Sequence, residues 1–538
     1  MSFAIVCSDL SFAWEDGTPV LDGLDVAFGT GRTGLIGVNG SGKSTLLKII
    51  AGELRPAMGT VGLQGEIGYL PQNLVLHDSA TVADLLGITE TRAALHAIER
   101  GEATEENFTA VGDDWDVEER ARAELDRLGL DHLDLDRRVP TLSGGEAVMV
   151  GLAARFLARP DILLLDEPTN NLDLDARHRL YDAVASWTGV LVVVSHDREL
   201  LDRVDEIADL RDGAVRTFGG NLSAYEELLA VEREAAERAV RAAETDVRRQ
   251  KRDLLEAHVK LARRKRYGAK MQEAKREPKI VMGERKRQAQ VSAGKHRIMH
   301  EERLADARDR LDEAAEAVRE DAEIRVALPA TNVPAGRTVA TVTGLTAPDP
   351  QIGTLTELIV RGPERIALTG PNGSGKTTFL RTLTGARAPG ETTVKISVDG
   401  VRYLPQRLDV LDDDLTVIDN VRLRAPSAAP STIRSGLARF LFRGARAEQP
   451  AGTLSGGERF RAVLASLLLA EPAPQLLLLD EPTNNLDMAS TRQLSQALTA
   501  YQGALIVVSH DVPFLRTLNL TRWLRIDRTT GLTETEPY

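Results

Sequence analysis

Two loops of this chain have the residue types and spacing that bind the phosphates of a nucleotide. GVNGSGKST at Gly37–Thr45 and GPNGSGKTT at Gly370–Thr378 both match the pattern GxxxxGK[ST]. In this pattern, glycines let the backbone bend around an anion, so that amide N–H groups and a helix N-terminus point at phosphate oxygens. The lysine reaches the β- and γ-phosphates, and the hydroxyl that follows it binds Mg²⁺. The sequence therefore predicts two sites for a nucleoside triphosphate with Mg²⁺.

The two loops supply matching sets of candidate ligands. We expect Lys43 and Lys376 to bind phosphate, and Ser44 and Thr377 to bind Mg²⁺. The other residues expected at the nucleotide are Gly37, Asn39, Gly40, Ser41, Gly42 and Thr45 in the first loop, and Gly370, Asn372, Gly373, Ser374, Gly375 and Thr378 in the second.

Four further motifs recur in the same order after each loop. They are YLPQ at Tyr69–Gln72 and Tyr403–Gln406, LSGGE at Leu142–Glu146 and Leu454–Glu458, [IL]LLLDEPTNNLD at Ile162–Asp173 and Leu476–Asp487, and VVSHD ending at Asp197 and Asp511. An internal repeat of this kind outweighs any local interpretation of one segment. The chain therefore holds two copies of one domain.

Each copy has an acidic pair at the end of an apolar run. Such runs are typical of short buried strands in a parallel sheet, and ligands bind at the carboxyl ends of these strands. Asp166 and Asp480 are suited to Mg²⁺, through water. Glu167 and Glu481 are predicted to polarise the attacking water.

These motifs resemble the ATP-binding cassette family, whose signature is LSGGE, over roughly Ser2–Asn221 and Thr338–Ile526. The resemblance implies an α/β fold with two tandem cassettes that bind ATP. It implies that Gln72 and Gln406 sense the γ-phosphate at the metal, and that His196 and His510 act as catalytic switch histidines. It also implies that the signature of one cassette closes over the ATP of the other, through Ser143, Gly144 and Gly145, and through Ser455, Gly456 and Gly457.

Composition narrows the class of protein. The formal charge is −13, the hydrophobic content is 42%, and Cys7 is the single cysteine, which excludes a disulfide framework and a Cys-ligated zinc site. The N-terminus lacks the pattern of a signal peptide. No apolar run approaches the ~20 residues that cross a bilayer. We expect a cytoplasmic protein with no membrane span, and any membrane partner would be another chain.

The first copy carries an insertion. Gln72 and Gln406 are 334 residues apart, but Ser143 and Ser455 are 312 apart, so the first copy has about 22 extra residues between these motifs. The expected site is Arg92–Glu118. Two interpretations stay open, a surface loop without a role and a small helical arm that touches a partner.

The segment between the copies, residues 222–337, is predicted to be a helical hairpin. One face would carry Leu228, Leu229, Ala235, Ala236, Ala239, Val240 and Val247. On the return, Leu304, Leu311 and Val318 step by sevens, as in a coiled coil. Pro278 and Gly283 would break a helix, which predicts a tip near Pro278–Gln290.

This linker is strongly basic. Lys251–Arg303 contains 17 Lys or Arg and 7 Asp or Glu, a net of +10, in a chain of net −13. Eight of the 12 lysines fall within Lys251–Lys295. A solvated helix face is the alternative, but such an island is suited to a polyanion bound through its phosphates. The candidate RNA-binding residues are Lys279, Arg285, Lys286, Arg287 and Lys295.

Two cassettes around a basic helical linker resemble the ABC-F subfamily, whose members act on the ribosome. The resemblance implies a monomer with intramolecular cassette pairing, made of a first cassette (1–221), a linker (222–337) and a second cassette (338–538). It implies the 70S ribosome as partner, with the linker near rRNA and the peptidyl tRNA, in translation regulation or antibiotic resistance. The alternatives are a cytoplasmic ATPase subunit of an exporter and a DNA-repair or chromosome ATPase.

The two nucleotide sites are expected to be unequal. In the family an aromatic residue before the phosphate loop stacks on adenine, and Trp14 is the candidate in the first cassette. Asp349 stands opposite it in the second cassette. After the signature, Arg461 in the second cassette corresponds to Met149 in the first. Both departures fall at the site of Lys376, where we expect weaker or less base-selective ATP binding.

Overall fold

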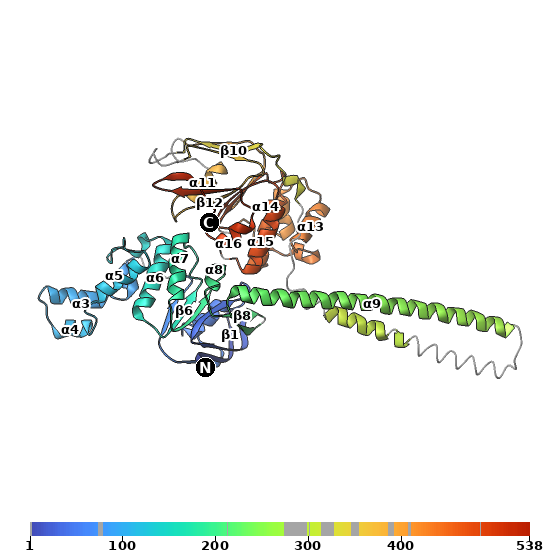
Figure 1. Ribbon diagram of the computed structural model, residues 1–538, viewed down its shortest axis with the longest axis horizontal. Helices are drawn as coiled ribbons and strands as arrows, with labels where there is room; N and C mark the ends of the chain where they lie inside the picture. The colour runs from blue at the N-terminus through green and yellow to red at the C-terminus, as the bar shows by residue number, and fades with distance from the viewer. Residues whose placement is uncertain are drawn as a thin grey trace. The chain divides into compact units, whose positions relative to one another are not determined.

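The computed structural model describes residues 3–73, 79–211, 213–273, 298–300, 302–313, 328–345, 355–385, 392–406, 410–484 and 486–537. The chain divides into two compact units (Figure 1). One unit consists of Met1–Leu222 with Glu323–Tyr538 and contains both repeats; the other consists of Ser223–Ala322.

Each repeat contains two sheets. A three-stranded antiparallel sheet has the order β2-β1-β4 in the first repeat and β11-β10-β13 in the second. Its strands are β1 (Phe3–Ala13), β2 (Pro19–Gly29) and β4 (Met58–Leu63), and β10 (Thr338–Thr343), β11 (Glu357–Arg361) and β13 (Thr393–Ile396). Cys7 is buried in β1.

A six-stranded sheet forms the centre of each repeat. In the first repeat the order is β5 (Ile67–Leu70), β6 (Ile162–Asp166), β7 (Val190–Val194), β3 (Gly31–Ile36), β8 (Glu206–Arg211) and β9 (Ala214–Gly219). In the second it is β14 (Val401–Leu404), β15 (Leu476–Asp480), β16 (Ala504–Val508), β12 (Arg365–Thr369), β17 (Arg522–Asp527) and β18 (Gly531–Thr535). Neighbouring strands are parallel except for the last, antiparallel pair. All residues of β6, β7, β15 and β16 are buried, as the apolar runs predicted.

Helices cover these sheets. In the first repeat they are α1 (Lys43–Ile50), α2 (Val82–Leu86), α3 (Thr89–Glu99), α4 (Glu105–Val111), α5 (Val117–Arg127), α6 (Gly144–Ala158), α7 (Leu174–Ala185) and α8 (Arg198–Leu201), with a 3-10 turn at Val139–Thr141. In the second they are α11 (Lys376–Leu383), α12 (Val417–Arg424), α13 (Pro430–Arg439), α14 (Gly456–Leu468), α15 (Met488–Ala500) and α16 (Val512–Thr517), with 3-10 turns at Pro329–Thr331, Gly444–Glu448 and Ala451–Thr453. The fold is therefore α/β with two tandem domains, as predicted.

The segment expected as an insertion is helical and consists of α3, α4 and the start of α5. Arg92 pairs with Glu118 (Nε–Oε1 2.5 Å) and with Asp136, which ties the two ends of the segment together. Phe108 and Trp115 are 45% and 47% exposed, with ring centroids 5.9 Å apart. The segment is therefore helical and not a loop, while its contact with a partner stays a prediction.

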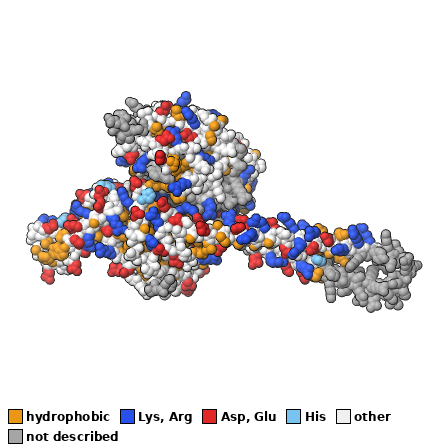
Figure 2. Space-filling view, in the orientation of Figure 1, with side chains coloured by type: hydrophobic (Ala, Val, Ile, Leu, Met, Phe, Trp, Pro, Cys, Tyr) orange, Lys and Arg blue, Asp and Glu red, His pale blue; other side chains and the backbone are white. Residues whose placement is uncertain are grey.

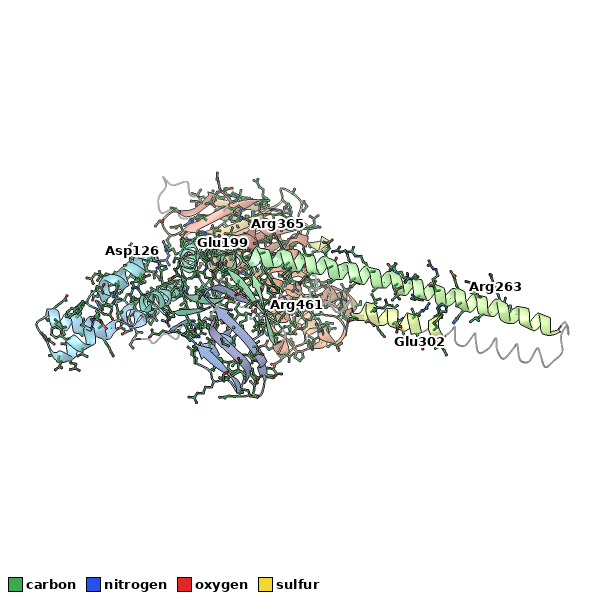
Figure 3. All side chains as sticks on the ribbon, turned by 60° about the horizontal axis from the view of Figure 1, so that its bottom comes forward. Asp126, Glu199, Arg263, Glu302, Arg365 and Arg461 are labelled. Carbon is green, nitrogen blue, oxygen red and sulfur yellow. The ribbon has the colours of Figure 1, made fainter. Side chains whose placement is uncertain are left out.

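The second unit contains most of helix α9 (Leu222–Glu273), which is 52 residues long and therefore about 78 Å at 1.5 Å per residue. Residues 298–300 and 302–313 are helical as well, and Figures 1 and 3 both draw them alongside α9. Leu304 and Ala307 are buried, and Arg310 pairs with Asp246 (3.3 Å). The linker is therefore a helical insertion whose return arm packs on α9, while Val318 and the predicted tip, Pro278–Gln290, lie outside the described residues.

The face assigned to α9 needs a correction. Leu229, Ala236, Val240 and Val247 are half-buried, whereas Leu228, Ala235 and Ala239 are exposed. These four half-buried positions are separated by seven, four and seven residues, as expected for one stripe of a helix that packs lengthwise on another. Small and apolar side chains also stand beside this stripe, so hydrophobicity alone could not fix its edges. In the described part of the chain, no helix combines the length and the apolar character that crossing a membrane requires.

Candidate functional site

The chemically active residues of each repeat lie at one edge of its central sheet. In the first repeat the phosphate loop follows β3, Asp166 ends β6, and His196 follows β7, and these strands are parallel neighbours. In the second repeat β12, β15 and β16 bring the second loop, Asp480 and His510 together in the same way. Motifs far apart in the sequence therefore meet at the carboxyl ends of adjacent strands.

The phosphate loops need glycine for conformation and for space. Gly40 and Gly42 have φ angles of 84° and 99°, in the left-handed region that disfavours side chains. A Cβ on Gly37 would lie 2.5 Å from the carbonyl oxygen of Leu210, and one on Gly370 would lie 2.1 Å from that of Ile526. Neither Gly37 nor Gly370 therefore has room for a side chain.

Each loop lysine folds over its own loop. Lys43 Nζ donates to the carbonyl oxygens of Gly37 (2.9 Å) and Val38 (3.0 Å), and Lys376 Nζ donates to those of Gly370 (2.7 Å) and Pro371 (3.0 Å). Burial lowers the pKa of both ammonium groups, and nearby carboxylates oppose that shift. Both lysines are therefore buried cations, and each is the first residue of a helix, α1 or α11.

Polar atoms without partners mark the place of a ligand. The hydroxyls of Ser41 and Ser374 are buried, and neither has a hydrogen-bond partner in the described part of the chain. Burying a hydroxyl without a partner is unfavourable. A phosphate oxygen would supply the missing acceptor, so both loops fit a nucleotide phosphate.

The candidate Mg²⁺ ligands lie side by side. Ser44 Oγ donates to Asp166 Oδ1 (2.9 Å), and Thr377 Oγ1 donates to Asp480 Oδ1 (3.3 Å). The second oxygen of each aspartate accepts from a tyrosine hydroxyl, Tyr69 (3.5 Å) or Tyr403 (2.8 Å). Hydroxyl and carboxylate oxygens are the donors that Mg²⁺ prefers. The sequence reasoning missed both tyrosines, although they open the repeated YLPQ motif.

A glutamate and a histidine face each other in each repeat. Glu167 Oε1 lies 3.3 Å from His196 Nε2, and Glu481 Oε1 lies 3.3 Å from His510 Nε2. Burial raises the pKa of Glu167 to about 8 and that of Glu481 to about 7, and burial lowers the pKa of His196 to about 3 and that of His510 well below its usual value. Perturbed groups of this kind cluster at functional sites.

The backbone at the two glutamates is strained. Their φ angles are +50° for Glu167 and +46° for Glu481, which is unusual for a side chain of this type. Such strain persists only where the surroundings hold the residue, and it occurs often at active sites. Both carboxylates are therefore held in a fixed direction at the strand ends.

One cavity combines residues from both repeats. It has a volume of about 390 Å³ and contains the signature residues Ser143, Gly144 and Gly145 of the first repeat. From the second repeat it contains the loop residues Asn372, Gly373, Gly375, Lys376, Thr377 and Thr378, together with Gln406, Asp480, Glu481 and His510. This is the combination expected for a site shared between two cassettes. Gln72, in the first repeat, follows β5 and is exposed.

Reciprocal hydrogen bonds join the two repeats. Asp173 Oδ2 accepts from the backbone N–H of Asn372 (3.3 Å), and Asp487 Oδ2 accepts from that of Asn39 (3.2 Å). The other carboxylate oxygen of each aspartate caps its own helix, α7 or α15. Each phosphate loop is thus held by the NNLD motif of the opposite repeat, a role that the sequence analysis did not assign.

The signature motifs begin helices. Ser143 and Glu146 form a capping box at the start of α6, and Ser455 and Glu458 form one at α14. A Cβ on Gly145 would lie 2.9 Å from the carbonyl oxygen of Asn171, so the signature glycine is needed for close packing.

The residues expected to differ between the sites are partly described. Trp14 is 45% exposed and packs edge-on against Phe12, which leaves its ring available to a ligand. Met149 is buried in α6, whereas the Arg461 guanidinium lies 6.0 Å from the Phe442 ring centroid. Asp349 lies outside the described residues, as do all five RNA-binding candidates, Lys279, Arg285, Lys286, Arg287 and Lys295.

Comparison with known proteins identifies the family. The family model described as ABC transporter matches residues 21–170 and 356–484, more than half of the chain. The chain is 36% identical to the tylosin resistance ATP-binding protein TlrC of Streptomyces fradiae over 92% of both chains. It is 32% identical to the probable ATP-binding protein YbiT of Escherichia coli O157:H7 over 94% of this chain and 93% of that one.

Solved structures share the fold. A chain titled RNase-L Inhibitor superposes with a TM-score of 0.56 and 18% identity, over 98% of this chain and 90% of that one. Both the paired sites and the comparisons agree: the chain belongs to the ABC transporter family of ATPases, in its ABC-F subfamily.

Proposed function

We propose that this ATPase binds the ribosome and acts with its basic linker on the peptidyl tRNA and the peptidyl-transferase region. The observation that carries the proposal is the +10 island of Lys251–Arg303 between two ATP-binding cassettes. In the described part of this island, Lys251, Arg252, Lys260, Arg263 and Arg266 are all exposed, and Figure 2 shows Lys and Arg side chains along the linker. Exposed cations on a long helix are suited to the phosphates of RNA.

The relatives support the finer part of the proposal. TlrC is named as a tylosin resistance protein, and it matches this chain over nearly its whole length. We therefore propose antibiotic resistance by protection of the 70S ribosome, with translation regulation as the related alternative. We further propose three segments, cassettes at 1–221 and 338–538 and a linker at 222–337, in a cytoplasmic protein that pairs its cassettes within one monomer.

The proposed chemistry follows from the residues at each site. The loop amides and Lys43 or Lys376 bind the phosphates, and Glu167 or Glu481 orients the attacking water. His196 or His510, neutral at pH 7, holds the γ-phosphate side of the site. Ser44, Gln72 and Asp166, and Thr377, Gln406 and Asp480, would hold Mg²⁺, which offsets charge on the β- and γ-phosphates.

The signature of the opposite cassette would complete each site. Ser143–Gly145 would close over ATP at Lys376, and Ser455–Gly457 would close over ATP at Lys43. ATP binding would then pair the cassettes and set the linker, and hydrolysis would release it.

Co-sedimentation with ribosomes tests the proposal. The variant Glu167→Gln with Glu481→Gln binds ATP without hydrolysing it, so with ATP it should stay on 70S ribosomes and slow translation. Without ATP it should not co-sediment. A double variant that never associates with ribosomes would contradict the proposal, whatever its ATP binding.

Charge reversal tests the linker. Changing Arg285, Lys286 and Arg287 to Glu should weaken ribosome association, and the salt dependence should lose about 0.7–0.9 of slope for each phosphate contact removed. The matched control changes Arg238, Arg241 and Arg248 to Glu, the same charge change outside the island. Equal effects of the two triple variants would mean that the linker acts only as a spacer.

A further inference from the structure

Arg177, on α7 of the first repeat, reaches into the second repeat. Its side chain is 9% exposed. Its Nη1 atom donates both to Asp197 Oδ2 (3.0 Å) and to the backbone carbonyl oxygen of His510 (3.3 Å). Its Nε atom donates to the carbonyl oxygen of Leu172 (3.3 Å). One guanidinium thus joins the SHD motif of the first repeat to the SHD motif of the second.

The two SHD aspartates interact across this contact. Asp197 accepts from Arg177, from Tyr181 Oη (2.8 Å) and from two N–H groups at the start of α8. Asp511 accepts from the N–H of Phe514 and caps α16. Burial raises the pKa of Asp511, the charge of Asp197 raises it further, and the charge of Arg177 lowers it. Arg177 therefore offsets the repulsion between two buried carboxylates from opposite repeats.

The two repeats differ at this position. Arg177 stands four residues after Asp173, which caps α7. The corresponding residue, four after Asp487 at the start of α15, is Thr491. Threonine has no cation and is too short to take the place of a guanidinium. The first repeat therefore contacts the second through a guanidinium at a position where the second repeat has a threonine.

We propose that Arg177 is a positioning residue that couples the two histidine loops, so that ATP hydrolysis at the second cassette depends on its pairing with the first. By holding the His510 carbonyl, Arg177 fixes the backbone whose N–H donates to Glu481 Oε2 (3.3 Å). The inference rests on the proposed role of Glu481 in hydrolysis. Separation of the cassettes would release His510, and with it the orientation of Glu481.

The hydrogen bonds give this role a measurable signature. Arg177 acts through the backbone of His510, whose carbonyl oxygen it holds and whose N–H donates to Glu481. Its removal should therefore lower kcat at the second site with little change in KM for ATP.

The experiment isolates one site at a time. Arg177→Gln is combined either with Glu167→Gln, which leaves turnover to Glu481, or with Glu481→Gln, which leaves it to Glu167. In the first background kcat should fall by on the order of tenfold, as for loss of one charge-assisted hydrogen bond, with KM for ATP little changed. In the second background both should stay in place, since Asp197 keeps Tyr181 and its helix N–H donors.

Two companion variants separate positioning from folding. Arg177→Lys keeps the charge and a donor, so in the first background it should restore part of the kcat that Arg177→Gln loses. Arg203→Gln is the matched control, because Arg203 packs on the Tyr181 ring (5.0 Å) and pairs with Asp182 (3.3 Å), both in the first repeat. It should change neither kcat nor KM at either site.

Either of two results would overturn the inference. One is an equal loss of kcat in both backgrounds, and the other is a kcat that Arg177→Gln does not lower in the Glu167→Gln background. If Arg177→Gln fails to fold, Arg177→Lys decides the question: a larger loss of kcat in the first background supports the inference, and equal losses overturn it. Failure of the proposed function would look different, because Glu481→Gln alone would then leave turnover at the second site unchanged.

Discussion

The two ATP sites share their motifs but differ in the charge of one residue, on the strand beside the one that leads into the phosphate loop. In the first repeat, β8 pairs with β3 so that Asp209 lies opposite Ile36. In the second, β17 pairs with β12 so that Arg525 lies opposite Thr369, the equivalent of Ile36. An acid in one site is thus replaced by a base in the other, although neither residue belongs to a recognised motif.

The charged groups around the two loop lysines differ accordingly. Lys43 is surrounded by the carboxylates of Glu167, Asp487, Asp166 and Asp209. Lys376 has the equivalent Glu481, Asp173 and Asp480, but Arg525 in place of the fourth carboxylate. The second site is therefore the more positive, and it should attract a triphosphate more strongly.

Base stacking works in the opposite direction. Trp14 is available to adenine at the first site, while its counterpart by sequence at the second is Asp349. We expect the first site to hold ATP mainly by its base and the second mainly by its phosphates. Similar motifs therefore leave room for two sites with different selectivity. The inequality predicted from Trp14 and from Met149 stays a prediction, now with an opposing contribution from charge.

The largest expected effect is loss of hydrolysis. Glu167→Gln with Glu481→Gln should lower ATP turnover by about 10²–10⁴, by analogy with the loss of a general base, because no carboxylate would orient water at either site. Turnover is measured by phosphate release, with each single variant reporting on the other site. Normal turnover in the double variant would remove the catalytic assignment from both glutamates.

Loss of the aromatic ring comes next. Trp14→Ala should remove about 1–3 kcal/mol of stacking, by analogy with base–aromatic contacts. This corresponds to roughly a five- to hundredfold loss in ATP affinity at the first site. Turnover measured against ATP and GTP concentration in the Glu481→Gln background reports this loss, because only the first site hydrolyses nucleotide there.

The control for Trp14→Ala is the same change in the Glu167→Gln background, where the second site should bind as before. Equal weakening of both sites would mean that Trp14 supports the fold instead of the base.

The charge exchange should give a smaller effect. Arg525→Gln should weaken ATP binding at the second site by about tenfold, equivalent to about 1.4 kcal/mol, because a cation near the loop lysine Lys376 is lost. Asp209→Asn, of nearly equal shape, should strengthen binding at the first site. Competition by inorganic triphosphate, which has no base, isolates this contribution. Sites that bind triphosphate equally well in the unaltered protein would refute the comparison.

The smallest difference is in pH dependence. Glu167 and Glu481 act only when ionised, and burial raises their pKa values to about 8 and about 7. As pH falls, the Glu167 site should therefore lose turnover first, and the Glu481 site should lose it about one unit lower. Turnover of Glu481→Gln and Glu167→Gln across the pH range measures the two limbs separately, and coincident limbs would contradict the expected order.

Much of each site could be predicted from the sequence because each motif carries its own local chemistry. The glycines, Lys43, Asp166 and Glu167 lie next to one another or at strand ends, where parallel pairing brings them together. The buried strands could be predicted as well, because a short apolar run that ends in Asp-Glu is compatible with few other structures. The basic island of the linker follows from composition alone.

The tertiary structure decided what depends on contacts between segments. The edge of the α9 stripe at Leu229 and Ala236, the tyrosines at Asp166 and Asp480, and the bonds from Asp173 and Asp487 to opposite loops all depend on packing. Only the register of β8 and β17 placed Asp209 and Arg525 near the loop lysines. Only the folded chain brought Arg177 into contact with His510. The sequence thus determined two ATP sites and their chemistry, whereas the structure decided how they differ, because electrostatic coupling depends on distance in space and not on position along the chain.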